Sequence, residues 1–124
     1  MSTITVTNIK ATGETASRAV SGVAGAWVNF NGTGTIAARD SLNVASLTDS
    51  STGNYVVNFS NNFGDGNFSA VAIQGNNDAS NAGVNATIAV GHTASSASGI
   101  ETSNLSSSNI DYEQISAVYH GDLA

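Results

Sequence analysis

Apolar and polar residues alternate with a period of two along most of the chain, and clusters of Gly, Asn, Asp and Ser separate the alternating runs. Such alternation is typical of β-strands with one buried face, and the separating residue types favour turns. The pattern predicts strands over residues 3–9, 26–31, 35–39, 42–47, 54–60, 67–74, 84–90, 100–105 and 114–120. No stretch keeps a helical repeat beyond one or two turns. About eight short strands at regular spacing predict an all-β fold, an antiparallel β-sandwich.

Two neighbouring runs are predicted to form a β-hairpin. Residues 54–60 place Tyr55, Val57 and Phe59 on one face, and the segment N-N-F-G-D-G at 61–66 supplies turn residues before the run 67–74. Asp40 and Ser41 are expected at the connection between the runs 35–39 and 42–47. Further turns or exposed loops are predicted at 49–53, 75–83, 93–98 and 106–109, where Asp, Asn, Ser and Gly gather.

Length and side-chain size together point to a single domain that assembles with copies of itself. The 124 residues allow one core, with residues 1–25 as an N-terminal strand and linker or attachment arm and residues 26–124 as the sandwich. Most of the apolar residues are Ala and Val, which stabilise a core less than large side chains do. Pro is absent, so no strand edge is guarded in that way. The expected anchors of the core or of a subunit interface are Trp27, Phe30, Tyr55, Phe59, Phe68 and Tyr119.

Charge and cysteine usage exclude several function classes. With three Lys and Arg residues against nine Asp and Glu, the net charge is −6, which does not suit a phosphate-tracking nucleic-acid surface or anionic lipid. The absence of Cys excludes disulfides and thiolate metal sites. The N-terminal residues lack the apolar core and basic start of a signal peptide, and no run approaches the roughly 18 apolar residues of a membrane span.

One segment of the chain resembles a known family. Residues 26–63 contain A-W-V-N-F-N-G-T-G-T, then R-D-S-L-N-V-x-S-L-T-D, then G-x-Y-x-V-N-F, and residues 115–122 read I-S-A-V-Y-H-G-D. These motifs resemble the C-terminal knob-type domain of bacteriophage tail-fibre proteins. The resemblance implies a β-sandwich that trimerises at a fibre tip and serves in virion attachment or host recognition, and it supplies no catalytic residue.

The resemblance also implies partners and a location. We expect homotrimers, contacts with other phage structural proteins through the N-terminal segment, and a host-surface glycan or protein as a further partner. The protein is then made in the host cytoplasm and placed on the tail or head surface of the virion. The alternative is a capsid decoration protein (a head fibre or cement protein) with an architectural role only.

Polar loops are the predicted recognition elements, because loops on a rigid scaffold are where binding usually resides. Their amide and carboxylate groups suit hydrogen bonding to a glycan or a polar host surface. The residues selected on this ground are Asn62, Asp65, Asn76, Asn77, Asp78 and Asn81.

The sequence contains candidate catalytic and metal-binding residues, but their patterns do not favour either chemistry. Asp40 and Ser41 with His92 or His120 are candidates for a hydrolase-type trio, but no G-x-S-x-G segment exists and Ser is abundant, so we expect no enzyme and no cofactor. Residues 61–66 and 76–78 carry oxygen ligands for calcium without the spaced carboxylates and terminal Glu of an EF-hand loop, which favours plain turns. Three copies of His92 or His120 on a threefold axis remain an alternative metal or pH-responsive site.

Overall fold

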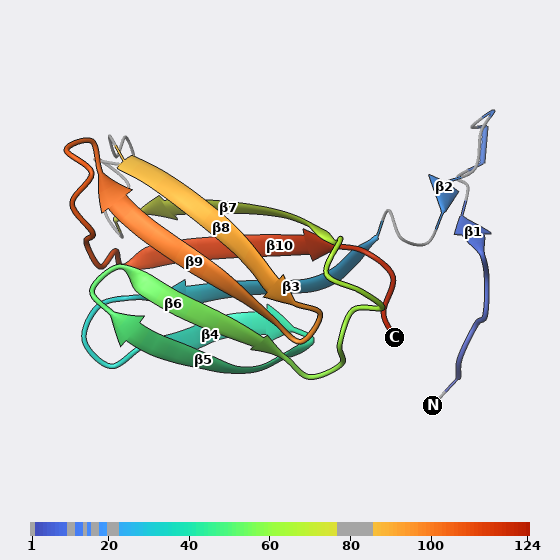
Figure 1. The fold of residues 1–124 in the computed structure, drawn as a ribbon. Coiled ribbons are helices and arrows are strands. Elements are labelled where there is room, and N and C mark those ends of the chain that lie inside the picture. Colours follow the sequence, from blue (N-terminus) through green and yellow to red (C-terminus); the bar gives the residue numbers. More distant parts are fainter. Residues whose placement is uncertain (1, 10–11, 14, 16–17, 20–22, 77–85) are drawn as a thin grey trace.

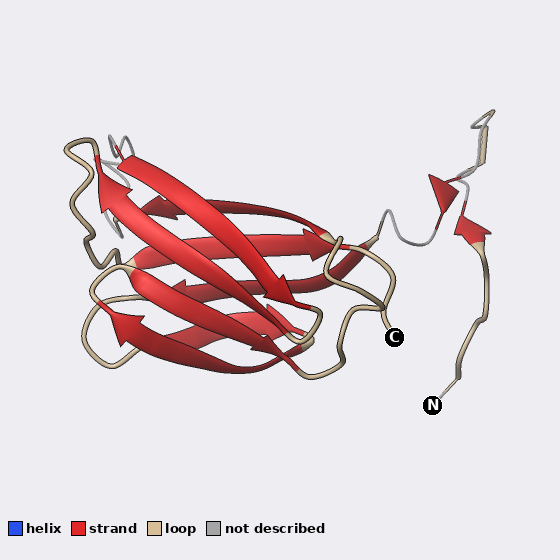
Figure 2. Ribbon diagram, viewed as in Figure 1, coloured by secondary structure: helices blue, strands red, loops and turns tan. Residues whose placement is uncertain are grey.

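The computed structural model describes residues 2–9, 12–13, 15, 18–19, 23–76 and 86–124, and every regular element within these ranges is a β-strand (Figures 1 and 2). Accordingly, no helix in this part of the chain is available to cross a bilayer. The strands are β1 (Asn8–Ile9), β2 (Arg18–Ala19), β3 (Ala24–Asn31), β4 (Ala37–Leu42), β5 (Val44–Ser51), β6 (Asn54–Phe59), β7 (Ser69–Gly75), β8 (Ala86–Ala94), β9 (Ala97–Asn104) and β10 (Gln114–His120).

Eight of these strands form two four-stranded sheets that pack face to face (Figure 1). The first sheet has the order β4-β3-β10-β7 and the second has the order β5-β6-β9-β8. Every pairing in both sheets is antiparallel. The prediction of an all-β antiparallel sandwich is therefore confirmed.

The predicted hairpin between residues 54–60 and 67–74 is wrong. β6 pairs with β5 and β9, whereas β7 pairs with β10 in the other sheet, so residues 60–68 cross between the sheets. Phe63 explains the crossover: its side chain is buried, its backbone N–H donates to the Ser95 carbonyl over 2.9 Å, and it forms a β-bridge with Leu123. Gly, Asn and Asp provide turn conformations in either arrangement, so their presence did not distinguish a hairpin from a crossover.

The turn between β4 and β5 lies at Asn43 rather than at Asp40 and Ser41, which are inside β4. Asn43 has a φ of 56°, a left-handed conformation that Asn adopts more readily than most residues. Its amide Nδ2 donates to the carbonyls of Gly25 and Asn61, and its Oδ1 accepts from the Asn61 backbone N–H over 2.7 Å. This single side chain holds the corner at which the chain passes from the first sheet to the second.

The core is built around aromatic rings from both sheets. Phe59 makes edge-to-face contacts with Phe63, Phe68 and Tyr119, with ring centroids 5.0, 5.7 and 5.0 Å apart. Such pairs add stability beyond the area that they bury. The buried hydrophobic side chains are Ala26, Val28, Phe30, Tyr55, Val57, Phe59, Phe63, Phe68, Ile100, Tyr112, Ile115, Ala117 and Tyr119.

Of the six expected anchors, Trp27 lies outside this core. It stands between the buried Ala26 and Val28 on β3, so the strand's alternation turns its ring to the outer face of the first sheet. Because residues 26–28 are all apolar, the sequence did not show which face of this strand is buried. Phe63 and Tyr112, by contrast, are buried from connecting segments that have no strand periodicity of their own.

The N-terminal residues form a separate arm that lies outside the sandwich (Figure 1). The predicted strand over residues 3–9 is confined to Asn8–Ile9, which pairs antiparallel with Arg18–Ala19. The alternation of this run allowed a half-buried or an edge strand, and the half-buried form is not found, since Ile4 is 86% exposed and Val6 is 47% exposed. β3 begins at Ala24, two residues before the predicted start of the sandwich.

The two ends of the sandwich differ in their loops. The arm end contains the start of β3, residues 60–68, the β8–β9 turn and the residues after β10, and the distal end contains the loops 32–36, 52–53 and 105–113. At the distal end the buried Tyr55 hydroxyl lies 3.0 Å from the Gly32 carbonyl and 2.7 Å from Asp111 Oδ1. Asp111 Oδ1 also accepts the Gly53 N–H over 2.6 Å, so one tyrosine and one carboxylate join three connecting segments.

Candidate functional site

The crossing segment 60–68 is fixed to the arm end by backbone hydrogen bonds. The Gly64 N–H donates to the Asp122 carbonyl over 2.7 Å, and the Ala124 N–H donates to the Asn62 carbonyl over 2.9 Å. The segment therefore pairs with the end of the chain, and its loop residues are held in one arrangement.

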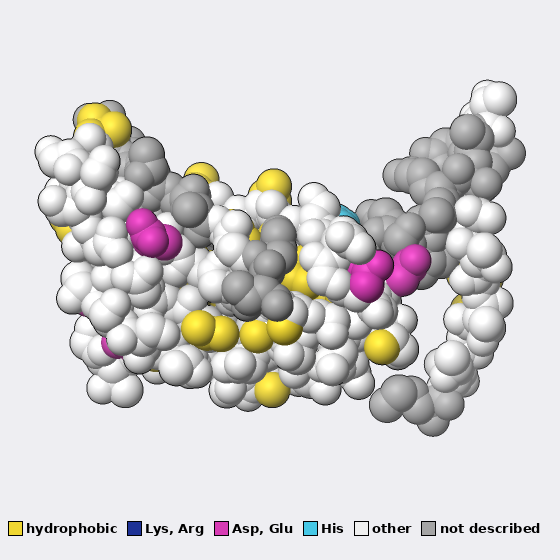
Figure 3. All heavy atoms as spheres, viewed as in Figure 1, with side chains coloured by type: hydrophobic (Ala, Val, Ile, Leu, Met, Phe, Trp, Pro, Cys, Tyr) yellow, Lys and Arg dark blue, Asp and Glu magenta, His cyan; other side chains and the backbone are white. Residues whose placement is uncertain are grey.

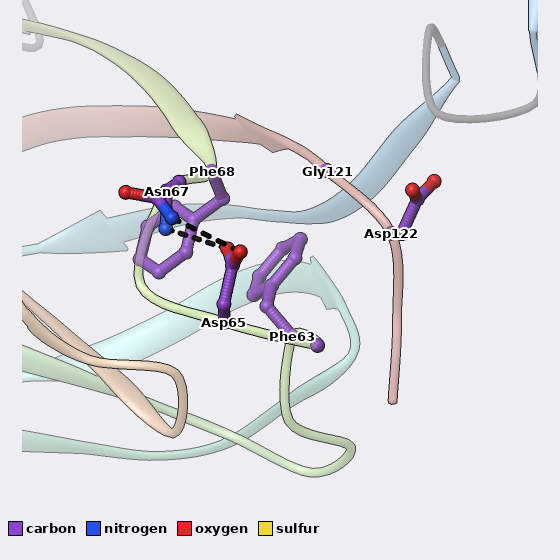
Figure 4. Close-up of a pocket in the computed structure, with 7 residues that line it drawn as sticks. Phe63, Asp65, Asn67, Phe68, Gly121 and Asp122 are labelled. Atoms are coloured by element: carbon purple, nitrogen blue, oxygen red, sulfur yellow. Dashed lines mark hydrogen bonds between the residues drawn. The ribbon is translucent and has the colours of Figure 1, made fainter.

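A cavity of about 370 Å³ opens between this segment and the residues that follow β10 (Figure 4). The rings of Phe63 and Phe68 stack in its wall with centroids 4.5 Å apart and an interplanar angle of 26°. A Cβ on Gly121 would lie 2.8 Å from Phe68 Cβ, so the close packing of the wall requires glycine there. The lining residues are Phe63, Gly64, Asp65, Asn67, Phe68, Gly121 and Asp122.

Asp65 is one of the two carboxylates that line this cavity. Its Oδ1 accepts the Asn67 backbone N–H over 2.8 Å and its Oδ2 accepts Asn67 Nδ2 over 3.0 Å, and these bonds, the backbone one first, lower the pKa of Asp65. In Figure 4 Asp65 points toward Asn67, whereas Asp122 points away from both. The two carboxylates thus do not converge on one point. The arrangement offers hydrogen-bond acceptors to a hydroxyl-bearing ligand rather than a cation cage.

The predicted recognition residues do not form one surface. Asn62 and Asp65 are both exposed at the arm end, and Asp65 lines the cavity there. Asn76 is exposed at the other end, because it follows Gly75, which pairs with the first residue of β10. The predicted residues Asn77, Asp78 and Asn81 lie outside the described residues. Of the predicted recognition residues that the structure describes, Asn62 and Asp65 thus lie at one end of the sandwich and Asn76 lies at the other.

The hydrolase-type trio is not assembled by the described side chains. The Asp40 Oδ1 accepts the backbone N–H of Ser41 over 2.8 Å, and the alternation of β4 turns the two side chains to opposite faces. Ser41 is in register with Ala117 across β3, and His120 lies three residues farther along β10, well beyond hydrogen-bond reach. The side chain of His92 lies outside what the structure describes. Within the described residues no three His, Asp or Glu side chains gather at a metal-binding distance.

An apolar row crosses the outer face of the first sheet. By strand register Leu42, Trp27, Val118 and Val71 are successive neighbours on β4, β3, β10 and β7. Val71 and Ile73 on the edge strand β7 are 64% and 69% exposed. They line a shallow groove of about 240 Å³ with Val118, Ala72 and Ser116. A contiguous exposed apolar patch of this kind usually marks an interaction surface.

The outer face of the second sheet carries polar side chains as well as apolar ones such as Val56. Asn58 Nδ2 lies 3.2 Å from both Ser46 Oγ and Thr48 Oγ1, and Gly91 faces Gly99 across the β8–β9 pair. Figure 3 shows several hydrophobic side chains near the middle of the side on which this sheet lies, together with a few carboxylates. The outer face of the second sheet is therefore mixed, whereas the apolar row of the first sheet crosses all four of its strands.

No protein-family model, curated protein or solved structure matches the chain. The sequence pattern pointed to the loops through their Asn and Asp residues. It missed the apolar row, because Val71, Ile73 and Val118 occur in runs where every second residue was expected to be buried and the face could not be assigned.

Proposed function

We propose that the chain is a structural protein of a bacteriophage virion, a knob-like module that works as a homotrimer. The observation that carries the proposal is the apolar row on the outer face of the first sheet. A row that crosses all four strands and is well exposed at β7 suits a module that buries this face against sister copies. Its role is attachment to the particle and recognition of the host surface.

The residues that carry the resemblance to tail-fibre knobs have defined roles in the fold, which supports the proposal. The segment 26–63 spans β3 to β6, and it contains Asn43 at the corner between the sheets and Tyr55 at the distal end. A Cβ on Gly32 would lie 2.6 Å from the Tyr55 hydroxyl, so the position of this tyrosine requires glycine at residue 32. The residues that carry the resemblance thus hold the corner between the sheets and the distal end of the sandwich.

The direction of the arm suggests which end recognises the host. The N-terminal segment enters β3 at the arm end, so attachment to other virion proteins through that segment places the distal end outward. Asn76 lies on the outward side in this arrangement, and a host glycan or protein would bind there. The cavity at Asp65 would instead face the particle.

Immunolabelling of virions tests the role directly. An antiserum against the purified protein should label particles in electron micrographs, and quantitative mass spectrometry should count the copies per particle. A few clusters of label at the tail would support the role in host attachment. Hundreds of copies spread over the capsid would instead support the architectural decoration role. Unlabelled particles that contain no copies would refute the virion assignment altogether.

A further inference from the structure

We infer that residues 2–6 of one copy pair with the outer edge of β7 in a neighbouring copy, so that each subunit completes the first sheet of the next. The inference rests on the proposed self-assembly and names its contact, but it does not depend on the virion role. It also assigns one strand of the N-terminal segment to a sister copy, and leaves the β1–β2 pair for contacts with other proteins.

The acceptor is an unguarded sheet edge. Among the described residues β7 is hydrogen-bonded as a strand only to β10, so its other side is an edge of the first sheet, although β8 of the second sheet packs near it. The outward side chains Val71 and Ile73 are well exposed, and β7 contains no Pro, Lys or other charged residue. Charged residues and Pro are the usual protection of an edge against pairing with another chain.

The donor is a strand-like segment without a partner strand. Residues 2–6 lie in no regular element, although T-I-T-V-T alternates as a strand does. Ile4 and Val6 are two residues apart, which is also the spacing of Val71 and Ile73. Addition of this segment to β7 would place both pairs on one side of the sheet, where all four side chains are now exposed.

Charge favours this contact over others. Each copy carries a net charge of −6, so copies repel one another wherever carboxylates would meet. Residues 2–9 and β7 contain no charged side chain. The two segments can therefore be brought together without placing like charges side by side.

The area of the apolar face indicates why the arm is needed. Four strands about 4.8 Å apart and seven residues long at about 3.3 Å each give a footprint of roughly 450 Å². A stable interface buries about 800 Å² on each partner, so the face alone falls short. An arm that leaves one copy for the next supplies further area. Because donor and acceptor are different surfaces, the contact is heterologous and can close as a ring of three.

Disulfide trapping tests the pairing directly, because the chain has no Cys and any introduced thiol is unique. Chains carrying V6C are mixed with chains carrying V71C and oxidised, and a disulfide-linked heterodimer is expected. The matched control replaces V71C with L105C, since Leu105 is equally exposed, at 66%, but lies in the β9–β10 loop. Cross-linking no greater than in the control would overturn the inference. So would a V6C/V71C double variant that closes only within single chains.

Self-association gives a second readout. I73K and I4D should each weaken assembly about tenfold or more in dissociation constant, measured by light scattering, whereas L105K should leave it unchanged. All three sites are exposed, so circular dichroism should show an intact fold. Folded I73K and I4D proteins that assemble as well as L105K would refute the arm exchange. A trimer with virion labelling but no V6C–V71C bond would refute the exchange alone, and unlabelled virions with the bond present would refute only the virion role.

Discussion

Replacement of Tyr55 by Phe isolates the hydrogen bonds that join the distal loops. The ring would keep its edge-to-face contact with Phe30, 5.3 Å between centroids, while the hydroxyl that contacts the Gly32 carbonyl and Asp111 Oδ1 is lost. Asp111 would keep the Gly53 N–H as a donor. The substitution therefore removes polar contacts with little change in packing.

The cost follows from the type of bond lost. A hydrogen bond to a charged group contributes about 1.5–3 kcal/mol, so Y55F should lower the free energy of unfolding by about 2 kcal/mol. For a domain of this size that corresponds to a melting temperature roughly 8 °C lower. Urea unfolding followed by circular dichroism should show a lower midpoint with an unchanged slope, at one fixed protein concentration.

Tyr119 provides the matched control. Its hydroxyl is buried in the core, where the Ser98 side chain lowers its pKa but forms no hydrogen bond of ordinary geometry with it. Y119F therefore removes a buried oxygen with only a weak polar contact, so the free energy of unfolding should stay the same or rise by about 1 kcal/mol. If Y55F and Y119F unfold at the same midpoint, the hydrogen bonds of Tyr55 do not stabilise the distal loops and the reasoning fails.

The same pair of residues makes the stability depend on alkaline pH. Burial, and next the hydrogen bond to Asp111, raise the pKa of Tyr55 well above its usual value. Burial raises the pKa of Tyr119 to about 12, a net value that includes a smaller lowering by Ser98. A raised folded-state pKa stabilises the fold fully below the unfolded pKa of about 10 and progressively less as the pH rises above it. The wild-type protein should lose stability between about pH 10 and 12, and Y55F should lose less over that interval.

Three further outcomes are expected. G53A should lower the free energy of unfolding by about 3 kcal/mol or more, because Gly53 has a φ of 68° and a Cβ there would lie 2.5 Å from a backbone oxygen. G34A is the matched control: Gly34 has a φ of 64° but a Cβ there would have no atom within 4 Å, so the free energy of unfolding should fall by only about 1 kcal/mol. N43A should cost about 2 kcal/mol in the same assay, and N43G should recover part of that loss, since glycine restores the backbone conformation of 56° but not the hydrogen bonds. Alanine at all three positions 76–78 should reduce virion adsorption to host cells without reducing assembly, and D65A at the other end should leave adsorption unchanged; the reverse result would place recognition at the arm end.

The candidate site was only partly accessible to sequence reasoning. Asn62, Asp65 and Asn76 were predicted to be exposed in loops and they are, because short polar residues in turns seldom have room in a core. Their distribution over two ends depended on how the chain crosses between the sheets. The apolar row could not be predicted, since it is a neighbour relation among four strands that are far apart in sequence.

The sequence by itself determined the class of fold and the buried face of one strand. In residues 54–59 strict alternation assigns Tyr55, Val57 and Phe59 to the core correctly, because a strand's side chains alternate regardless of what it pairs with. Pairing was decided only in the tertiary structure. β6 joins β9, and β7 joins β10, because buried Phe63 draws the connecting segment between the two sheets. Local alternation is the same for either partner, so the choice follows from which arrangement buries the aromatic rings together.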